Sequence, residues 1–212
     1  MPAPKRRTRK PISRQLVIRV DLLGAKPPIW RRLALSSDLT LDQLHWVLQT
    51  AFAWHNSHLH EFVAGDRWAR GFDRISYSPP EFQMEENGLG TVNDTRTHFL
   101  GDILRAPGDK LFYIYDFGDD WEHRLVLEKL VERDPDDPAA RCLAGRRASP
   151  PEDSGGIWQY QYMMEAGFDP NHPGYADAQE WVEWAFGDEP FDPAAFDVKA
   201  MDEHLVTMFE PA

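Results

Sequence analysis

The most constraining feature of this sequence is a pair of apolar runs separated by Gly118-Asp119-Asp120, a tripeptide suited to a tight turn. Residues 110–117 place apolar or aromatic side chains on both alternating faces, which is typical of a strand in the middle of a sheet. Residues 121–131 read as a strand that alternates between apolar and mostly charged side chains. The two runs therefore predict an antiparallel hairpin at the centre of a sheet.

Other segments add strands before this hairpin and helices after it. Strands are predicted at residues 15–23, 29–35 and 58–63, with 67–72 pairing with the last across the Gly65-Asp66 turn. Apolar residues at helical spacing predict a helix at 41–54, N-capped by Thr40, and a turn or two of helix at 99–104. Helical patterns also fill 158–166, 175–186 and 198–209, whereas 73–95, 132–140 and 141–156 show no regular period.

This order of elements predicts an α+β fold. Its sheet is mixed but mainly antiparallel, with one packed helix in the N-terminal half and a helical C-terminal region. The chain has 212 residues, 42% of them hydrophobic, enough to bury about 70% of the unfolded surface in one domain. We therefore predict a single domain at 14–210, preceded by a disordered basic tail at 1–13.

Cysteine content and hydropathy bear on the compartment. The one cysteine, Cys142, permits no intrachain disulfide, which fits a reducing environment. The sequence contains neither an apolar run long enough for a membrane span nor a secretory signal. These features predict a cytoplasmic protein without membrane contacts.

Charge is distributed unevenly along the chain. Residues 1–14 hold six of the 23 basic residues and no acid, which leaves 17 basic against 35 acidic residues in the remainder. An acidic body repels nucleic acid, so contact with nucleic acid is expected only through the tail, with an affinity that falls steeply with salt. Proteins are the expected partners of the acidic domain.

Five phrases of the sequence occur together in a characteristic order. They are Lys26-Pro27-Pro28-Ile29-Trp30-Arg31-Arg32, Asn56-Ser57-His58-Leu59-His60-Glu61-Phe62, Tyr115-Asp116-Phe117-Gly118-Asp119-Asp120-Trp121-Glu122-His123, Arg141-Cys142-Leu143-Ala144-Gly145, and Pro150-Pro151-Glu152-Asp153 with Gly155-Gly156. In this combination the chain resembles the plasmid pRiA4b ORF-3-like family, also labelled insertion-element passenger proteins of a TnpR family. The resemblance covers roughly residues 14–206. It implies an α+β domain linked to plasmids or transposable elements, and it implies no established chemistry.

The resemblance also implies cysteines where this chain has Ser149 and Ser154. Of that set only Cys142 remains, so a structural zinc site built from thiolates is not expected here. No phosphate-binding glycine motif, nucleophile elbow or zinc-protease motif is present either, and the sequence assigns no cofactor.

The predicted hairpin turn carries the first candidate ligand set. Asp116, Asp119, Asp120 and His123 flank it, and carboxylate oxygens suit a hard divalent cation that could activate water. In the alternative interpretation, the acids stabilise a tight turn and His123 is a hydrogen-bonded core histidine.

A second candidate set lies on the strand predicted at 58–63. His58 and His60, followed by Glu61, stand two residues apart, so on a strand the two imidazoles share a face and could chelate a transition metal. A third ligand would come from His123, Cys142 or Glu152. The alternative is a polar strand edge whose histidines bond to neighbouring loops.

The third set is Glu152 and Asp153, in a loop that begins with two prolines and ends with two glycines. Its acids could instead pair with Arg31 or Arg32. We expect any ligand site to lie where this loop, the 58–62 strand and the 116–123 turn meet. The aromatic residues of the C-terminal region are interpreted as core rather than as base-stacking groups: Trp158, Tyr160, Tyr162, Trp181, Trp184 and Phe186.

Two classes of function remain open from the sequence. The favoured one is a binding or accessory module of mobile elements that acts through protein contacts. The alternative is a divalent-metal-dependent hydrolase or nuclease built on His58, His60, Asp116, Asp120 and His123. The alternative requires the three histidines to converge in an open cleft, and it fails if they are separate or sealed in the core.

Overall fold

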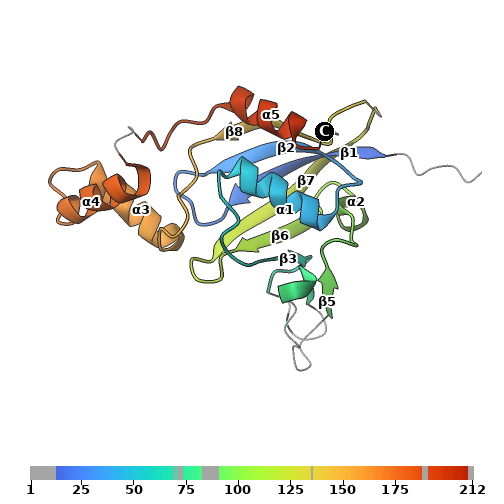
Figure 1. The fold of residues 1–212 in the computed structure, drawn as a ribbon, viewed down its shortest axis with the longest axis horizontal. Coiled ribbons are helices and arrows are strands. Elements are labelled where there is room, and N and C mark those ends of the chain that lie inside the picture. The colour runs from blue at the N-terminus through green and yellow to red at the C-terminus, as the bar shows by residue number, and fades with distance from the viewer. Residues whose placement is uncertain are drawn as a thin grey trace, which may run out of the picture.

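The computed structural model describes residues 13–68, 70, 74–82, 91–134, 136–187 and 191–209. The tail predicted at 1–13 therefore lies outside the described residues, apart from Ser13. The described chain forms one eight-stranded mixed sheet with helices, an α+β fold (Figure 1). Among the described residues, no helix is both long and apolar enough to span a membrane.

The strands and helices have the following bounds. The strands are β1 Arg14–Leu22, β2 Trp30–Ser36, β3 His60–Ala64, β4 Ile75–Ser78, β5 Thr91–Asp94, β6 Lys110–Tyr115, β7 Trp121–Glu132 and β8 Ala140–Arg146. The helices are α1 Leu41–Ala51, α2 Leu100–Ile103, α3 Gly156–Gly167, α4 Tyr175–Phe186 and α5 Val198–Thr207, with a 3-10 turn at Pro80–Phe82.

The order of strands across the sheet is β5-β4-β3-β6-β7-β1-β2-β8, and only β4 and β5 run parallel. As the sequence predicts, β6 and β7 form an antiparallel hairpin in the two middle positions of the sheet. In its register, Tyr115 lies opposite Trp121. The N-terminal hairpin of β1 and β2 inserts between β7 and β8. Three neighbouring pairs of this sheet join strands that are not consecutive in the sequence: β3 with β6, β7 with β1, and β2 with β8.

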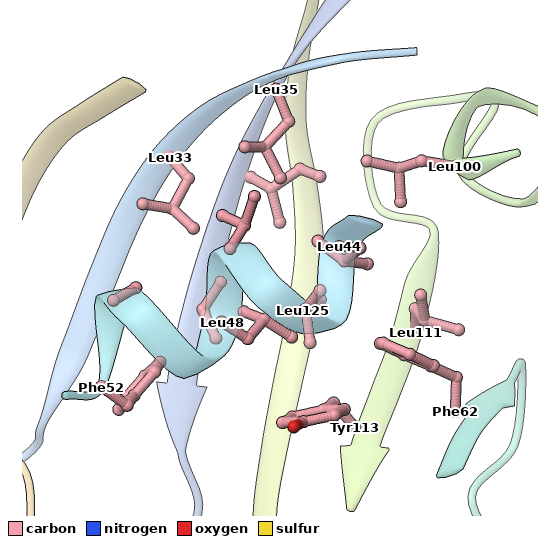
Figure 2. Close-up of a cluster of buried hydrophobic side chains, with 14 of the residues drawn as sticks. Leu33, Leu35, Leu44, Leu48, Phe52, Phe62, Leu100, Leu111, Tyr113 and Leu125 are labelled. Carbon is pink, nitrogen blue, oxygen red and sulfur yellow. The ribbon is translucent and has the colours of Figure 1, made fainter. Parts of the chain in front are cut away.

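Helix α1 covers one face of this sheet and forms the core with it (Figure 2). Its first turn is fixed by Thr40, whose hydroxyl accepts from the Gln43 N–H at 3.2 Å while the Gln43 side chain accepts from the Thr40 N–H at 3.0 Å. Leu44 and Leu48 are fully buried against the sheet, and burial of each such side chain contributes about 1.5–3 kcal/mol. The opposite face carries ion pairs such as Arg32 with Glu128, as expected of a sheet with one solvated face.

Helix α5 packs along the edge strand β8, where Asp202 accepts from Arg141 at 2.6 Å and from the Cys142 N–H at 2.9 Å. Helices α3 and α4 pack on each other and extend beyond one end of the sheet (Figure 1). The core interpretation of their aromatic residues is therefore wrong for three of them, since Trp158 is 77% exposed, Trp184 61% and Tyr162 47%. Tyr160 is buried, against the edge of Trp181.

Two further predictions are corrected by the structure. β3 pairs with β6 and with β4 rather than with 67–72, and β4 lies in the stretch 73–95 that shows no regular period in the sequence. Arg67 and Trp68 lie in the turn after Gly65, and part of 67–72 lies outside the described residues. The loop predicted at 141–156 begins with strand β8, which pairs with β2. It contains no β-branched or aromatic residue, the types that mark a strand in sequence.

Candidate functional site

Three loops meet at one end of the sheet, and we call this region the loop junction. They are residues 52–59 between α1 and β3, 116–120 between β6 and β7, and 147–155 between β8 and α3. The Tyr115 hydroxyl donates to Glu152, whose carboxylate also accepts from the His55 N–H at 3.1 Å. Asp119 accepts from the Gly155 N–H at 2.9 Å. The three stretches expected from the sequence to meet therefore lie in contact.

The backbone of the loop junction is strained. All non-glycine residues with a positive φ in the described chain lie in these three loops: Ala53, Asn56, Asp116, Asp120, Arg147 and Asp153. The left-handed region costs a residue with a Cβ on the order of 1 kcal/mol or more, although Asn and Asp tolerate it best. Such strain persists where the surrounding contacts fix one conformation, and it concentrates at functional sites.

Within the loop junction, three side chains bring potential metal ligands together. The Nε2 atom of His58 lies 3.0 Å from Oδ1 of Asp153 and 3.6 Å from Oδ2 of Asp116. One ligand atom from each residue falls within 4.8 Å of the others. We call these residues the His58–Asp116–Asp153 cluster.

The two nearest atoms of the cluster do not form an ordinary hydrogen bond. His58 Nε2 is buried and has no hydrogen-bond partner of acceptable geometry among the described residues. The other oxygen of Asp116 is already engaged, since Oδ1 accepts from the Gly118 N–H at 2.9 Å. The Asp153 side chain is 64% exposed. The cluster is thus fixed on one side and open to solvent on the other.

These distances fit a first-row divalent metal. Ligands bound at about 2.0–2.1 Å in a tetrahedron lie about 3.3–3.4 Å apart, between the two separations measured from His58. One imidazole and two carboxylates form a donor set that such metals accept, and three protein ligands leave a coordination position for water.

The other two predicted ligand histidines lie elsewhere. His60 is buried on β3 and stacks on His45 with ring centroids 3.7 Å apart, and burial lowers the pKa of His60 to about 3. His123 is completely buried beside Phe52 and Trp54, and burial lowers its pKa to about 3 as well. The three histidines are therefore not joined in an open cleft. The hydrolase built on His58, His60 and His123 together fails on this geometry.

The remaining predicted acids hold structure around the junction. Glu61 pairs with Arg74. Asp119 bonds the 147–155 loop, as described above, and Asp120 is 63% exposed, with Arg67 4.0 Å away. Glu152 joins the loops through Tyr115 and His55. None of these residues belongs to the metal-compatible group found among the described residues.

The proposed pairing of loop acids with Arg31 or Arg32 is absent from the described residues. Arg32 forms a bidentate pair with Glu128, at 2.6 and 2.9 Å, and Arg31 bonds to carbonyls and to Ser149. The Cys142 thiol is buried, and desolvation raises its pKa to about 11, which does not suit a nucleophile.

Sequence reasoning missed the residues that complete this end of the sheet. His45 lies on the buried face of α1 and bonds through Nδ1 to the Tyr113 hydroxyl and through Nε2 to the Asn56 side chain, each at 2.9 Å. Burial lowers its pKa to about 4. A histidine among the apolar positions of a predicted helix is the signal that could have indicated these hydrogen bonds, because a buried polar group requires a partner.

Comparisons with known proteins support one family. A family model described as plasmid pRiA4b ORF-3-like protein matches residues 14–200. The uncharacterized protein y4hQ of Sinorhizobium fredii is 33% identical over 183 residues, which cover 84% of this chain and 84% of that protein. The crystal structure of MM3350, a protein of unknown function from Methanosarcina mazei Go1, superposes with a TM-score of 0.73 at 30% identity, covering 90% of this chain and 98% of that one.

Proposed function

The chain belongs to the plasmid pRiA4b ORF-3-like family, and we propose that it is a binding module that takes up a divalent transition metal at the His58–Asp116–Asp153 cluster. We further propose that it acts in the cytoplasm, through protein partners, as an accessory protein of a plasmid or transposable element. The family assignment supports the plasmid link. The single cysteine and the acidic domain support the compartment and the choice of partner.

One observation carries the proposal. Three residues from three separate loops present ligand atoms within 4.8 Å of one another, and the nitrogen at their centre is buried without a hydrogen bond. A buried ring nitrogen without a partner costs free energy, which a bound metal would recover. Asp116 and Asp153 both have a positive φ, a conformation that persists where the surrounding contacts fix it. Two of the three ligand residues are therefore held in place by the fold.

Metal analysis of the purified full chain tests this proposal. Titration calorimetry with Zn²⁺ and Mn²⁺ is expected to show one site per chain. His58→Ala, Asp116→Asn and Asp153→Asn are each expected to weaken binding at least tenfold, because each removes a ligand. Asp177→Asn is the matched control, since Asp177 is an exposed aspartate of α4 outside the junction. Binding that survives Asp153→Asn and His58→Ala would disprove the assignment.

A metal-dependent hydrolase or nuclease is the second candidate, in a form restricted to this cluster. The observation that favours it is the solvent-facing side of the cluster, at the 64% exposed Asp153, where a metal-bound water could sit. Hydrolysis of a phosphodiester substrate that requires the added metal, and that is lost in His58→Ala but not in Asp177→Asn, would favour this function. Metal binding without any such activity would favour the binding module.

A further inference from the structure

Arg31 is a buried cation without a carboxylate partner in the described part of the chain. It lies on β2 and is 2% exposed. Its Nε donates to the Ala51 carbonyl at 2.8 Å, and Nη1 donates to the carbonyls of Trp30 and Arg146 at 3.0 and 3.2 Å. Nη2 donates to the Ser149 hydroxyl at 3.0 Å. A guanidinium has five N–H groups, so these bonds leave one of them on Nη2.

All of these partners are neutral, so the charge of Arg31 is not compensated by them. A buried charge without an opposite charge is costly, and burial accordingly lowers the pKa of Arg31 to about 10. The rings of Phe196 and Phe52 lie on the guanidinium, with centroids 3.8 and 4.9 Å from its central carbon. Aromatic faces attract a cation, but they do not neutralise it.

Arg31 and Ser149 both line a cavity of about 450 Å³, within the range of about 300–1,000 Å³ typical of small-molecule sites. Its walls are largely apolar and include Phe52, Phe186, Phe191 and Phe196. The cavity lies between α1, the 147–155 loop and the segment leading into α5. An apolar cavity with one convergent polar corner is the usual form of a ligand site.

Two carboxylates also line this cavity, and both already have donors. Glu152 accepts from Tyr115 and from His55. Asp197 caps α5 by accepting from the Ala200 N–H at 3.0 Å. Neither carboxylate forms an ion pair with Arg31 among the described residues, so the guanidinium keeps one free N–H and no opposite charge. An anion would therefore fit at the end of the cavity where Arg31 and Ser149 meet.

We propose that this cavity binds a small apolar carboxylate. The free N–H of Arg31 and the hydroxyl proton of Ser149 donate to its carboxylate group, and the phenylalanine rings contact its apolar part. Arg31 supplies the opposite charge in a desolvated setting, where charge-assisted hydrogen bonds are strongest. The site is separate from the metal cluster and does not rest on the proposed function.

Titration calorimetry with three probes tests the proposal on the full chain. Octanoate is expected to bind at one site per chain. Octanamide, which has the same shape without the charge, is expected to bind at least tenfold more weakly, and acetate, which lacks the apolar part, should give no measurable heat. The same octanoate affinity is expected in the presence of EDTA and in the Asp153→Asn variant. Loss of octanoate binding and loss of metal binding are therefore distinguishable outcomes.

Variants locate the binding. Ser149→Ala removes one donor and should weaken octanoate binding several-fold, and Ala195→Trp, at the rim of the cavity, should abolish it. Ala194→Trp is the matched control, because this exposed neighbour does not line the cavity. Arg31→Met should also abolish binding; if that variant does not fold, the two others decide. Equal affinity for octanoate and octanamide, no octanoate binding by the parent protein, or unchanged binding in Ser149→Ala and Ala195→Trp would each overturn the proposal.

Discussion

The α1 face of the sheet and the loop junction lie next to each other, and both are rich in histidine. On the α1 face, His45, His60 and His123 are at most 4% exposed, and burial lowers the pKa of each to between about 3 and 4. At the junction, the His58 side chain is 27% exposed and faces two carboxylates. The first three are held neutral within the fold, whereas His58 has the surroundings of a ligand.

The difference shows that the location of a histidine decides its role more than its neighbours in sequence do. His58 and His60 are two residues apart, yet the strand begins at His60, so only the second is fixed inside the sheet. The lowered pKa of a buried histidine makes the free energy of unfolding depend on pH. The four predictions that follow separate the two regions by measurement.

The largest expected effect is loss of stability in acid. A histidine whose pKa is about 3 or 4 in the folded state and about 6.5 when unfolded takes up its proton only on unfolding. Each such residue therefore lowers the free energy of unfolding by up to about 1.4 kcal/mol per pH unit as the pH falls below 6.5, down to the folded pKa. Urea denaturation at pH 7.5, 6.5, 5.5 and 4.5 measures the slope.

His123→Phe identifies the source of that slope. The substitution removes one titrating group from a fully buried aromatic environment, so the acid dependence should become shallower by about one third. His172→Phe is the control, because His172 lies outside the sheet in the α3–α4 connection. An acid slope that is unchanged in His123→Phe would show that this residue is not held neutral.

The second prediction compares two tyrosines on β6. Tyr113→Phe should lower the free energy of unfolding by about 1–3 kcal/mol, because it leaves both His45 and Gln49 without the hydroxyl that each contacts at 2.9 Å. Tyr115→Phe, at the loop junction, should cost about 0.5–1.5 kcal/mol, because the groups that it leaves are partly exposed. They are the Ser57 N–H, which donates to the hydroxyl at 2.9 Å, and Glu152, which keeps its contacts with His55. Urea denaturation at pH 7.5 compares them, and a larger loss in Tyr115→Phe would contradict the division of roles.

The third prediction concerns Asp153→Asn. In the absence of metal it should change the free energy of unfolding by less than about 0.5 kcal/mol, because the side chain is 64% exposed. With metal at a hundred times its Kd, the parent protein should gain about 2.7 kcal/mol and the variant almost none. Thermal unfolding with Zn²⁺ and with EDTA measures both, and an equal gain in the two proteins would count against the cluster.

The smallest effect is expected for removal of residues 2–12. The domain begins with β1, whose pairing with β2 and β7 extends to Gln15 and Arg14. We expect the Tm to stay within about 1 °C and the metal affinity to stay unchanged. Thermal unfolding of the shortened chain checks this, and a loss of several degrees would show that these residues support the fold. If the tail binds DNA, the shortened chain should lose that binding, and affinity in the full chain should fall steeply with salt.

The sequence predicts the parts of this fold that have strong periodic patterns. The central hairpin and α1 follow from alternation and helical spacing of apolar residues. Strand β8 escapes prediction because it has no β-branched or aromatic residue and lies at an edge. The exposure of Trp158 escapes prediction because periodicity does not show what a helix packs against. The meeting of three loops could be expected, but the separation of His58 from His60 depends on where β3 begins, a boundary that periodicity does not fix.

The strand order also has a consequence for how the protein folds in time. The three loops of the junction lie between residues 52 and 155, about half the chain, and the third loop follows β8, which joins the sheet only through β2. Such non-local pairing is slow, because long stretches of chain are ordered before the contacts that stabilise them form. We therefore expect the junction to form late in folding, so that its ligand does not bind the transition state. Its stabilisation should consequently appear almost wholly as slower unfolding, so that the bound protein persists longer without folding any faster.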